Sequence, residues 1–298
     1  MTEVESGSQG HYALTPASGH SANVKPSSPS VYARSLDLTE KISLDELVHV
    51  IDGFRLVEFT ATAASYGQEH YGYVVTPNVD HLIRYYDDSA FRAHYRAADF
   101  ILMDSRFAAC LVRLLKGIRI PVCTGSDLTA QLLANVVQPT DRLIMIGCSD
   151  AQAQQLAVTY GLTNVRHHNP PMGFIEDATS VEACLTFIES ASPFRFCFLA
   201  VGSPQQETIA YRLRLRGVAR GMVLCVGAAL NFLTGIEKRA PVWMQRIALE
   251  WLYRLVQNPK RLARRYLVRG PRIFAHLLRT RVVVRNSPDM RAKPSSQA

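Results

Sequence analysis

Short apolar runs alternate with amphipathic segments along most of this 298-residue chain, and this alternation restricts the fold more than any other feature. The apolar runs occupy residues 56–60, 73–76, 100–103, 143–147, 196–201 and 222–226. Helical patterns lie between them, for example over residues 128–137, 151–160 and 205–216. Several runs are apolar throughout, as is typical of parallel strands buried on both faces. Strands and helices that alternate in this way predict an α/β fold with a mostly parallel sheet.

The two ends of the chain differ from this central part. Residues 1–35 are rich in Ser, Gly and Pro and have no repeating apolar face, so we expect them to be disordered. They also lack the apolar stretch of a signal peptide. We assign residues 36–240 to the α/β domain, residues 241–285 to a basic helical appendage and residues 286–298 to a flexible tail. No apolar run reaches the roughly 18–20 residues that span a bilayer.

Positive charge is concentrated in the C-terminal part. From Pro241 onward there are 13 Lys or Arg and two acids, whereas residues 1–240 have 20 basic and 23 acidic residues. Apolar residues recur four apart in this part, at Trp243, Ile247, Trp251 and Leu255. Basic amphipathic helices separated by prolines fit a segment that lies on an anionic membrane surface. Ordinary helices that pack on the domain and expose their arginines would give the same pattern.

Cysteine and histidine spacing predicts no metal centre. The six cysteines are dispersed in apolar surroundings without a C-x-x-C pair, which is typical of free thiols in a reduced cytosol. His167 and His168 have no third ligand at metal spacing. The glycine fingerprints of dinucleotide sites and P-loops are also missing. We therefore expect neither a metal nor an organic cofactor.

Polar residues follow several predicted strands, at the positions where parallel sheets bind ligands. Thr76, Asn78 and Asp80 follow one strand, and they also suit the cap of the next helix. Asp104 follows another strand and is placed as a catalytic base would be, although an ion pair with Arg106 explains it more simply. Later turns add Gly202, Ser203, Gln205, Gln206 and Asn231. Amide side chains both donate and accept hydrogen bonds, so they suit sugar hydroxyls or a uracil edge.

These residues occur in the order of one known family. The chain resembles the WecG/TagA/CpsF family of bacterial glycosyltransferases over roughly residues 45–270. The resemblance is carried by residues 76–80 (TPNVD), 98–104, 124–128 (TGSDL), 201–207 (VGSPQQE), 226–235, 238–243 (KRAPVW) and 249–255 (LEWLYRL). The most specific part is residues 226–235, followed by residues 238–243 and 249–255.

The resemblance implies an inverting enzyme without an obligatory metal, and we expect a Rossmann-like domain with helices on both faces of the sheet. The enzyme would move a hexose from a UDP-sugar to a polyprenyl-diphosphate-linked saccharide. Asp104 would be the general base, with Thr76 and Asn78 in the family's Thr-x-Asn motif.

The resemblance also gives the basic C-terminal part a role. It would reach the membrane and close over the donor diphosphate. Arginine holds phosphate oxygens with two donors at once, and the candidates here are Arg239, Arg246 and Arg254.

Two positions depart from the family pattern. Ser105 and Arg106 follow Asp104 where a glycine is usual, and Asp80 stands where many members have glutamate. Both positions are near the predicted sugar site. N-acetylmannosamine is therefore not carried over as the donor sugar, and glucosyl transfer in exopolysaccharide synthesis is at least an equal candidate.

The sequence thus predicts a hexosyltransferase that is peripheral at the inner face of the cytoplasmic membrane. Its partners would be a UDP-sugar donor, a lipid-diphosphate-linked acceptor and an anionic membrane surface, whereas homo-oligomer formation stays open. A nucleotide-dependent oxidoreductase is one alternative, but it would carry a glycine fingerprint. A nucleic-acid-binding protein is another, but it would interleave exposed aromatic residues with arginines, whereas Trp243 and Trp251 share an apolar stripe.

Overall fold

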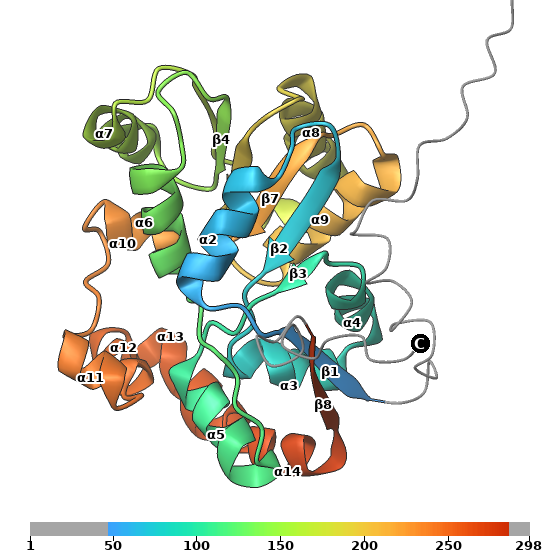
Figure 1. Ribbon diagram of the computed structural model, residues 1–298, viewed down its shortest axis with the longest axis vertical. Coiled ribbons are helices and arrows are strands. Elements are labelled where there is room, and N and C mark those ends of the chain that lie inside the picture. The colour runs from blue at the N-terminus through green and yellow to red at the C-terminus, as the bar shows by residue number, and fades with distance from the viewer. Residues whose placement is uncertain (1–46, 286–298) are drawn as a thin grey trace, which may run out of the picture. The chain divides into compact units, whose positions relative to one another are not determined.

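The computed structural model describes residues 47–285 of the chain (Figure 1). The disordered segment predicted for residues 1–35 and the tail predicted for residues 286–298 lie outside this range. The strands are β1 (Val48–Asp52), β2 (Tyr71–Val75), β3 (Phe100–Ile101), β4 (Leu143–Ile146), β5 (Val165–His168), β6 (Phe196–Leu199), β7 (Gly221–Cys225) and β8 (Arg281–Arg285).

The helices fall into two groups along the chain. Those before β7 are α2 (Leu56–Ser65), α3 (Val79–Asp87), α4 (Ser89–Arg96), α5 (Arg106–Lys116), α6 (Gly125–Asn135), α7 (Asp150–Tyr160), the 3₁₀ turn η2 (Phe174–Glu176), α8 (Ala178–Ser190) and α9 (Gln205–Arg216). Those after β7 are α10 (Ala229–Leu233), α11 (Val242–Arg246), α12 (Glu250–Gln257), α13 (Pro259–Ala263), the π-helical segment η3 (Arg264–Arg269) and α14 (Arg272–Arg279).

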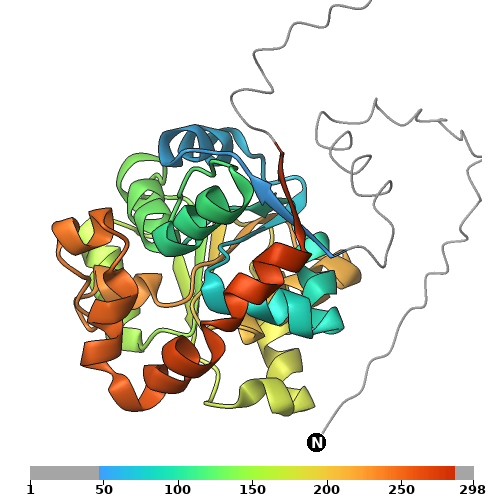
Figure 2. The same cartoon turned by 90° about the horizontal axis from the view of Figure 1, so that it is seen from below.

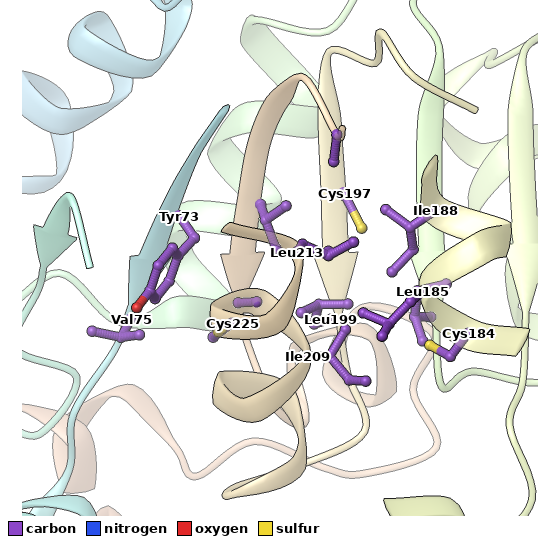
Figure 3. Close-up of a cluster of buried hydrophobic side chains, with 14 of the residues drawn as sticks. Tyr73, Val75, Cys184, Leu185, Ile188, Cys197, Leu199, Ile209, Leu213 and Cys225 are labelled. Carbon is purple, nitrogen blue, oxygen red and sulfur yellow. The ribbon is translucent and has the colours of Figure 1, made fainter. Parts of the chain in front are cut away.

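Six strands form one parallel sheet in the order β3-β2-β7-β6-β4-β5. Tyr73 and Val75 of β2 face a layer that includes α8 and α9, whereas Val74 between them faces a layer that includes α2 and α6. Figure 3 shows the first layer, where Ile209 and Leu213 of α9 lie beside the strands. Since neighbouring residues of a strand point to opposite faces, burial on both faces requires an unbroken apolar run. The predicted Rossmann-like α/β fold is confirmed.

The strand predicted at residues 56–60 is wrong, because these residues begin helix α2. Phe59 and Ala63 are buried, and their spacing of four residues matches one face of a helix. The Glu58 carboxylate accepts a hydrogen bond of 2.9 Å from the Arg55 backbone N–H, and this capping interaction stabilises the start of the helix. A short apolar run is compatible with both the strand and the helix period, so the sequence alone does not decide between them.

The C-terminal part predicted as a helical appendage is helical only up to Arg279. Its last residues form β8, which pairs in parallel with β1 in a second, two-stranded sheet. Arg285 forms an ion pair with the fully buried Asp52 of β1, with 2.6 Å between Arg285 Nε and Asp52 Oδ1. The run Val282–Val284 favours a strand, but Asp52 and Arg285 are 233 positions apart, so no local pattern indicates that this strand pairs with β1.

The segment from α11 to α14 is a run of short helices that leads back to β1 (Figures 1 and 2). The helix predicted through Trp243 and Leu255 is interrupted, because Ala248 adopts a left-handed φ of 61° between α11 and α12. By contrast, α14 buries Ile273 and Leu277 against α3 and α5. No helix within residues 47–285 has the length and apolar character needed to cross a membrane.

The buried ion pair generates a stability prediction. Arg285→Met should lower the free energy of unfolding by about 3–5 kcal/mol, because it removes the guanidinium that donates two hydrogen bonds to the fully buried Asp52 carboxylate. Urea denaturation measures this loss. Arg279→Met is the control, since Arg279 is an exposed arginine in the last turn of the preceding helix α14, and its loss should stay within about 1 kcal/mol. Equal losses in the two variants would contradict a special role for the Asp52–Arg285 pair.

Candidate active site

The carboxyl ends of the sheet strands meet at a cavity of about 890 Å³. Thr76 after β2, Asp104 after β3, Gly147 after β4, Gly202 after β6 and Gly227 after β7 all line it. Parallel α/β sheets bind their ligands at this edge, because several loops and helix N-termini converge there. The segment after β7 adds further wall residues from α10, α12, α13 and α14: Phe232, Trp251, Arg254, Leu262 and Phe274.

Most of the residues predicted from the sequence lie around this one cavity. The lining includes Thr76, Asn78, Asp80, Asp104, Gly202, Ser203, Gln205, Gln206, Asn231 and Arg254. Arg239 and Arg246 are not part of the lining, and Arg246 is exposed. The fold thus brings ten of the twelve candidates together, and their roles in binding and catalysis stay predictions.

Asp104 is a partly buried carboxylate held against the start of α6. Its Oδ1 accepts a hydrogen bond of 2.8 Å from the Gly125 backbone N–H, and its own N–H donates to Pro77 O at 2.9 Å. Burial raises the pKa of Asp104 to about 6, opposed by the Gly125 hydrogen bond and the nearby Arg254 charge. A carboxylate with such a pKa is still ionised at neutral pH but is a stronger base than an exposed aspartate.

Thr76 and Asn78 have structural partners as well as positions on the cavity. The buried Thr76 hydroxyl donates to Cys225 O at 2.9 Å and so joins the ends of β2 and β7. Asn78 is the N-cap of α3, and its Oδ1 accepts from the Asp80 N–H at 3.0 Å. The Asp80 carboxylate lies 3.7 Å from Arg84 on the same helix. Asn78 therefore caps α3 and at the same time lines the cavity.

A buried hydrogen-bond chain joins the loops that follow β6 and β7. Gln206 donates through Nε2 to Glu207 Oε1 at 2.9 Å, and it accepts through Oε1 from the Gly227 N–H at 2.9 Å. Both side chains are almost fully buried. Burial raises the pKa of Glu207 to about 7. Glu207 was not among the predicted site residues, and its place beside Gln206 in the first turn of α9 was the available signal.

Asn231 is engaged by neighbouring side chains. Its Oδ1 accepts from Gln152 Nε2 at 2.9 Å, and its Nδ2 donates to Glu237 Oε1 at 3.4 Å. Its amide therefore connects α7, α10 and the loop after α10. Both a binding role and a purely structural role fit this geometry.

The arginines of the C-terminal part contact carboxylates of the protein itself. Arg239 forms a close ion pair with Asp127 and lies 4.0 Å from Glu250. Arg254 lies 3.7 Å from Glu237, and its guanidinium lies over the Phe232 ring at 5.4 Å from the centroid. Both charges are near enough to oppose the rise in the pKa of Asp104.

Several lining residues were missed by sequence reasoning. They are Arg106, Phe107, Glu237, Glu250, Leu262 and Phe274, together with part of the loop before η2, including Asn169, Pro171 and Met172. Three of them, Glu250, Leu262 and Phe274, belong to helices whose position depends on the return of β8 to β1. The sequence carries no local signal for that return.

Cysteines and histidines have ordinary structural surroundings. All six cysteines are free, and all but Cys110 are buried. His167 Nδ1 lies 3.0 Å from Asp150, and His168 lies against Phe187 with 5.2 Å between ring centroids. Within residues 47–285, no cluster of three or more His, Cys, Asp or Glu is arranged to hold a metal ion.

Comparison with known proteins agrees with the geometry. The model of the WecG/TagA/CpsF family of glycosyl transferases matches residues 44–287. The chain belongs to this family. A relative in Bacillus subtilis (strain 168), N-acetylglucosaminyldiphosphoundecaprenol N-acetyl-beta-D-mannosaminyltransferase, is 27% identical over 170 residues. That match covers 56% of this chain and 64% of the relative, so the chain spans less than two thirds of the relative's length.

Glu207 generates a pH-dependent stability prediction. The folded protein raises the pKa of this carboxyl from 4.5 to about 7, so the protonated form is favoured by folding. The contribution of the protonated Glu207 carboxyl to the stability of the folded protein is therefore present at pH 4–5 and is lost as the pH rises through about 7. Glu207→Gln, which stays neutral, should therefore gain up to about 3 kcal/mol over the wild type between pH 5 and pH 8.

Urea denaturation at both pH values measures this difference. Glu182→Gln on the exposed face of α8 is the control and should follow the wild type. If the free energy of unfolding depends on pH in the same way for Glu207→Gln and the wild type, then folding does not raise the pKa of Glu207.

Proposed function

We propose that this protein transfers a hexose from a UDP-sugar to a polyprenyl-diphosphate-linked saccharide in the synthesis of a cell-surface polysaccharide or exopolysaccharide. The observation that carries the proposal is Asp104, a carboxylate with a pKa of about 6 in the wall of a large cavity at the strand ends. Family membership supplies the reaction class. The Bacillus subtilis relative is named for transfer of N-acetylmannosamine to a lipid-diphosphate sugar, and we extend that acceptor class to this chain.

In the proposed mechanism, Asp104 accepts the proton of the acceptor hydroxyl while the acceptor oxygen forms a bond to the anomeric carbon of the donor sugar. The bond from that carbon to the UDP oxygen breaks on the opposite side, so the configuration inverts. The cavity contributes by holding both substrates in line. The leaving UDP accumulates negative charge, which cations and helix N-termini stabilise.

The loop before α9 is suited to the donor diphosphate. Gly202 has a left-handed φ of 81°, and open space surrounds the position where a side chain would begin. Only glycine adopts this conformation readily, and the backbone beside the cavity stays accessible. Arg254 on the cavity wall and Arg239 nearby are the cations that we assign to the same diphosphate.

We also propose that the protein binds the inner face of the cytoplasmic membrane through the segment from α11 to η3. Trp243, Ile247, Val256, Leu267 and Val268 are each more than half exposed. Lys260, Arg264 and Arg269 in the same segment are exposed cations. Apolar side chains and cations together favour an anionic lipid surface.

The test of the transferase is a panel of UDP-sugars incubated with the wild-type protein and a short-chain lipid-diphosphate sugar. We expect UDP release that depends on the acceptor for one donor, of the glucose or N-acetylmannosamine type. Asp104→Asn should keep the fold and lose about two to four orders of magnitude in kcat, the range for a positioned base. The wild-type kcat/KM should rise with pH through about 6, because the base must be unprotonated to act.

Asp150→Asn is the control, since Asp150 is an exposed aspartate outside the cavity lining, and its kcat should match the wild type. Wild-type protein that releases no UDP with any donor and acceptor contradicts the transferase. Asp104→Asn that is folded and nearly as active as the wild type contradicts only the assignment of the base.

Membrane binding is tested by sedimentation with vesicles. The wild type should sediment with anionic vesicles and be released as salt increases, because salt screens the surface charges. Replacing Trp243 and Val256 by serine should reduce binding several-fold, since about 1.5–3 kcal/mol accompanies burial of each large apolar side chain. The control replaces Leu215 and Val218, exposed apolar residues outside this segment, and should bind as the wild type does. Equal binding to neutral and anionic vesicles would argue against the electrostatic contribution.

A further inference from the structure

Arg106 is a cation in the cavity wall to which the proposed mechanism gives no role. It begins α5, two residues after Asp104, and lines the cavity. Its Nη2 lies 3.9 Å from Asp127 Oδ2, which is too far for a hydrogen bond. Its Nη1 is buried and has no hydrogen-bond partner within the described part of the chain. A buried guanidinium nitrogen without an acceptor is costly, so this position favours an anionic ligand.

The carboxylate nearest to Arg106 is already bound more closely by another arginine. Asp127 forms a close ion pair with Arg239, and its backbone N–H donates to Thr124 Oγ1 at 3.1 Å. Burial opposes ionisation of Asp127, but the hydrogen bonds from Arg239 and Thr124 outweigh it and lower its pKa. Asp127 therefore neutralises Arg239 first and compensates Arg106 only from a distance.

Arg106 and the proposed base both contact the first turn of α6. Asp104 is held there by the Gly125 N–H, and Arg106 faces Asp127 in the same turn. In an inverting displacement the acceptor hydroxyl approaches from the side opposite to the leaving diphosphate. Since Arg239 and Arg254 are assigned to the leaving diphosphate, we place Arg106, which follows the base by two residues, on the acceptor side of the reaction. The acceptor of the proposed reaction carries a diphosphate of its own.

Apolar residues of the wall adjoin this cation. Phe107 follows Arg106 in the chain, and its ring lies 6.1 Å from the Trp251 ring between centroids. Both residues line the cavity, as do Leu262 of α13 and Phe274 of α14. One wall thus combines a guanidinium with a set of apolar side chains. Such a wall suits a ligand with an anionic head and a hydrocarbon tail.

We infer that Arg106 binds the diphosphate of the lipid-linked acceptor, and that Phe107, Trp251, Leu262 and Phe274 contact the first isoprene units of its lipid. The inference rests on the proposed function for the identity of the acceptor. The planar guanidinium contacts two phosphate oxygens at once, which a lysine in the same place does not. By holding the acceptor diphosphate, Arg106 then fixes the position of the acceptor hydroxyl relative to Asp104. It is a positioning residue for the acceptor.

The test is a titration of the full-length protein with farnesyl diphosphate, farnesol and UDP, followed calorimetrically. Arg106→Gln should weaken farnesyl diphosphate binding at least about tenfold, the usual loss for a hydrogen bond between charged groups, and leave UDP binding within about twofold. The affinity of Arg106→Lys for farnesyl diphosphate should lie between those of the wild type and Arg106→Gln. Farnesol binding should not change in either variant.

Arg113→Gln is the matched control, since it removes an exposed arginine from the last turn of the same helix, and it should match the wild type. Circular dichroism and thermal melting establish that each variant is folded, and Arg106→Lys serves if Arg106→Gln does not fold. Equal loss of UDP binding would assign Arg106 to the donor diphosphate and overturn the inference. Unchanged binding of farnesyl diphosphate, or none by the wild type, would also overturn it.

Kinetics separate this inference from the proposed function. Arg106→Gln should raise the KM for the acceptor and leave the KM for the donor unchanged, and a merely structural role would alter both. An acceptor sugar that carries a neutral alkyl group in place of the lipid diphosphate should be used equally well by Arg106→Gln and the wild type. If the wild type transfers no sugar at all, the proposed function fails, and the titrations still decide whether Arg106 binds a lipid diphosphate.

Discussion

The ion pair between Asp52 and Arg285 fixes the path of the C-terminal part of the chain. Asp52 is fully buried, and its Oδ2 accepts from both Arg285 Nη2 at 3.0 Å and the Ile101 N–H at 2.7 Å. One carboxylate therefore joins β1, β3 and β8. Because a buried charge must be paired to be tolerated, β8 is held where it lies. The segment from α10 to α14 must then pass the strand ends on its way back, and this path gives the cavity its second wall.

The second wall is attached unevenly. At its far end α14 buries Ile273 and Leu277 in the core, whereas α11 and α12 contain no buried residue. Ion pairs hold the middle of the wall, including Arg239 with Asp127 and the 3.7 Å contact of Arg254 with Glu237. Parts of a protein with few buried apolar contacts open at lower free energy than the core. We therefore expect α14 to stay packed in the core, whereas α11 and α12 over the cavity open at lower free energy, where substrates would enter and leave.

An element can be predicted from the sequence when its own residues determine it, and it cannot when a distant partner does. Central strands such as β4 and β6 are apolar on both faces, so composition alone reveals them. Edge strand β5 has no fully buried residue and therefore no apolar run, and β8 depends on a partner 233 positions away. In the site, Thr76, Asp104 and Gln206 follow recognisable strands and were predicted for that reason. Glu250 lines the cavity because α12 packs beside it, which no spacing in the sequence indicates, whereas Arg106 follows Asp104 by two residues at the start of α5.

Charge balance links the two halves of the site. Arg239 and Arg254, the cations assigned to the donor diphosphate, already face Asp127, Glu250 and Glu237. A diphosphate that binds them therefore competes with carboxylates, and its affinity is reduced by the contacts that it replaces. Within the described residues Arg106 has no comparable partner, since the carboxylate that it approaches, Asp127, lies 3.9 Å away. An anion that meets Arg106 gains an interaction without breaking a close ion pair, which supports our assignment of the acceptor diphosphate to this side of the cavity.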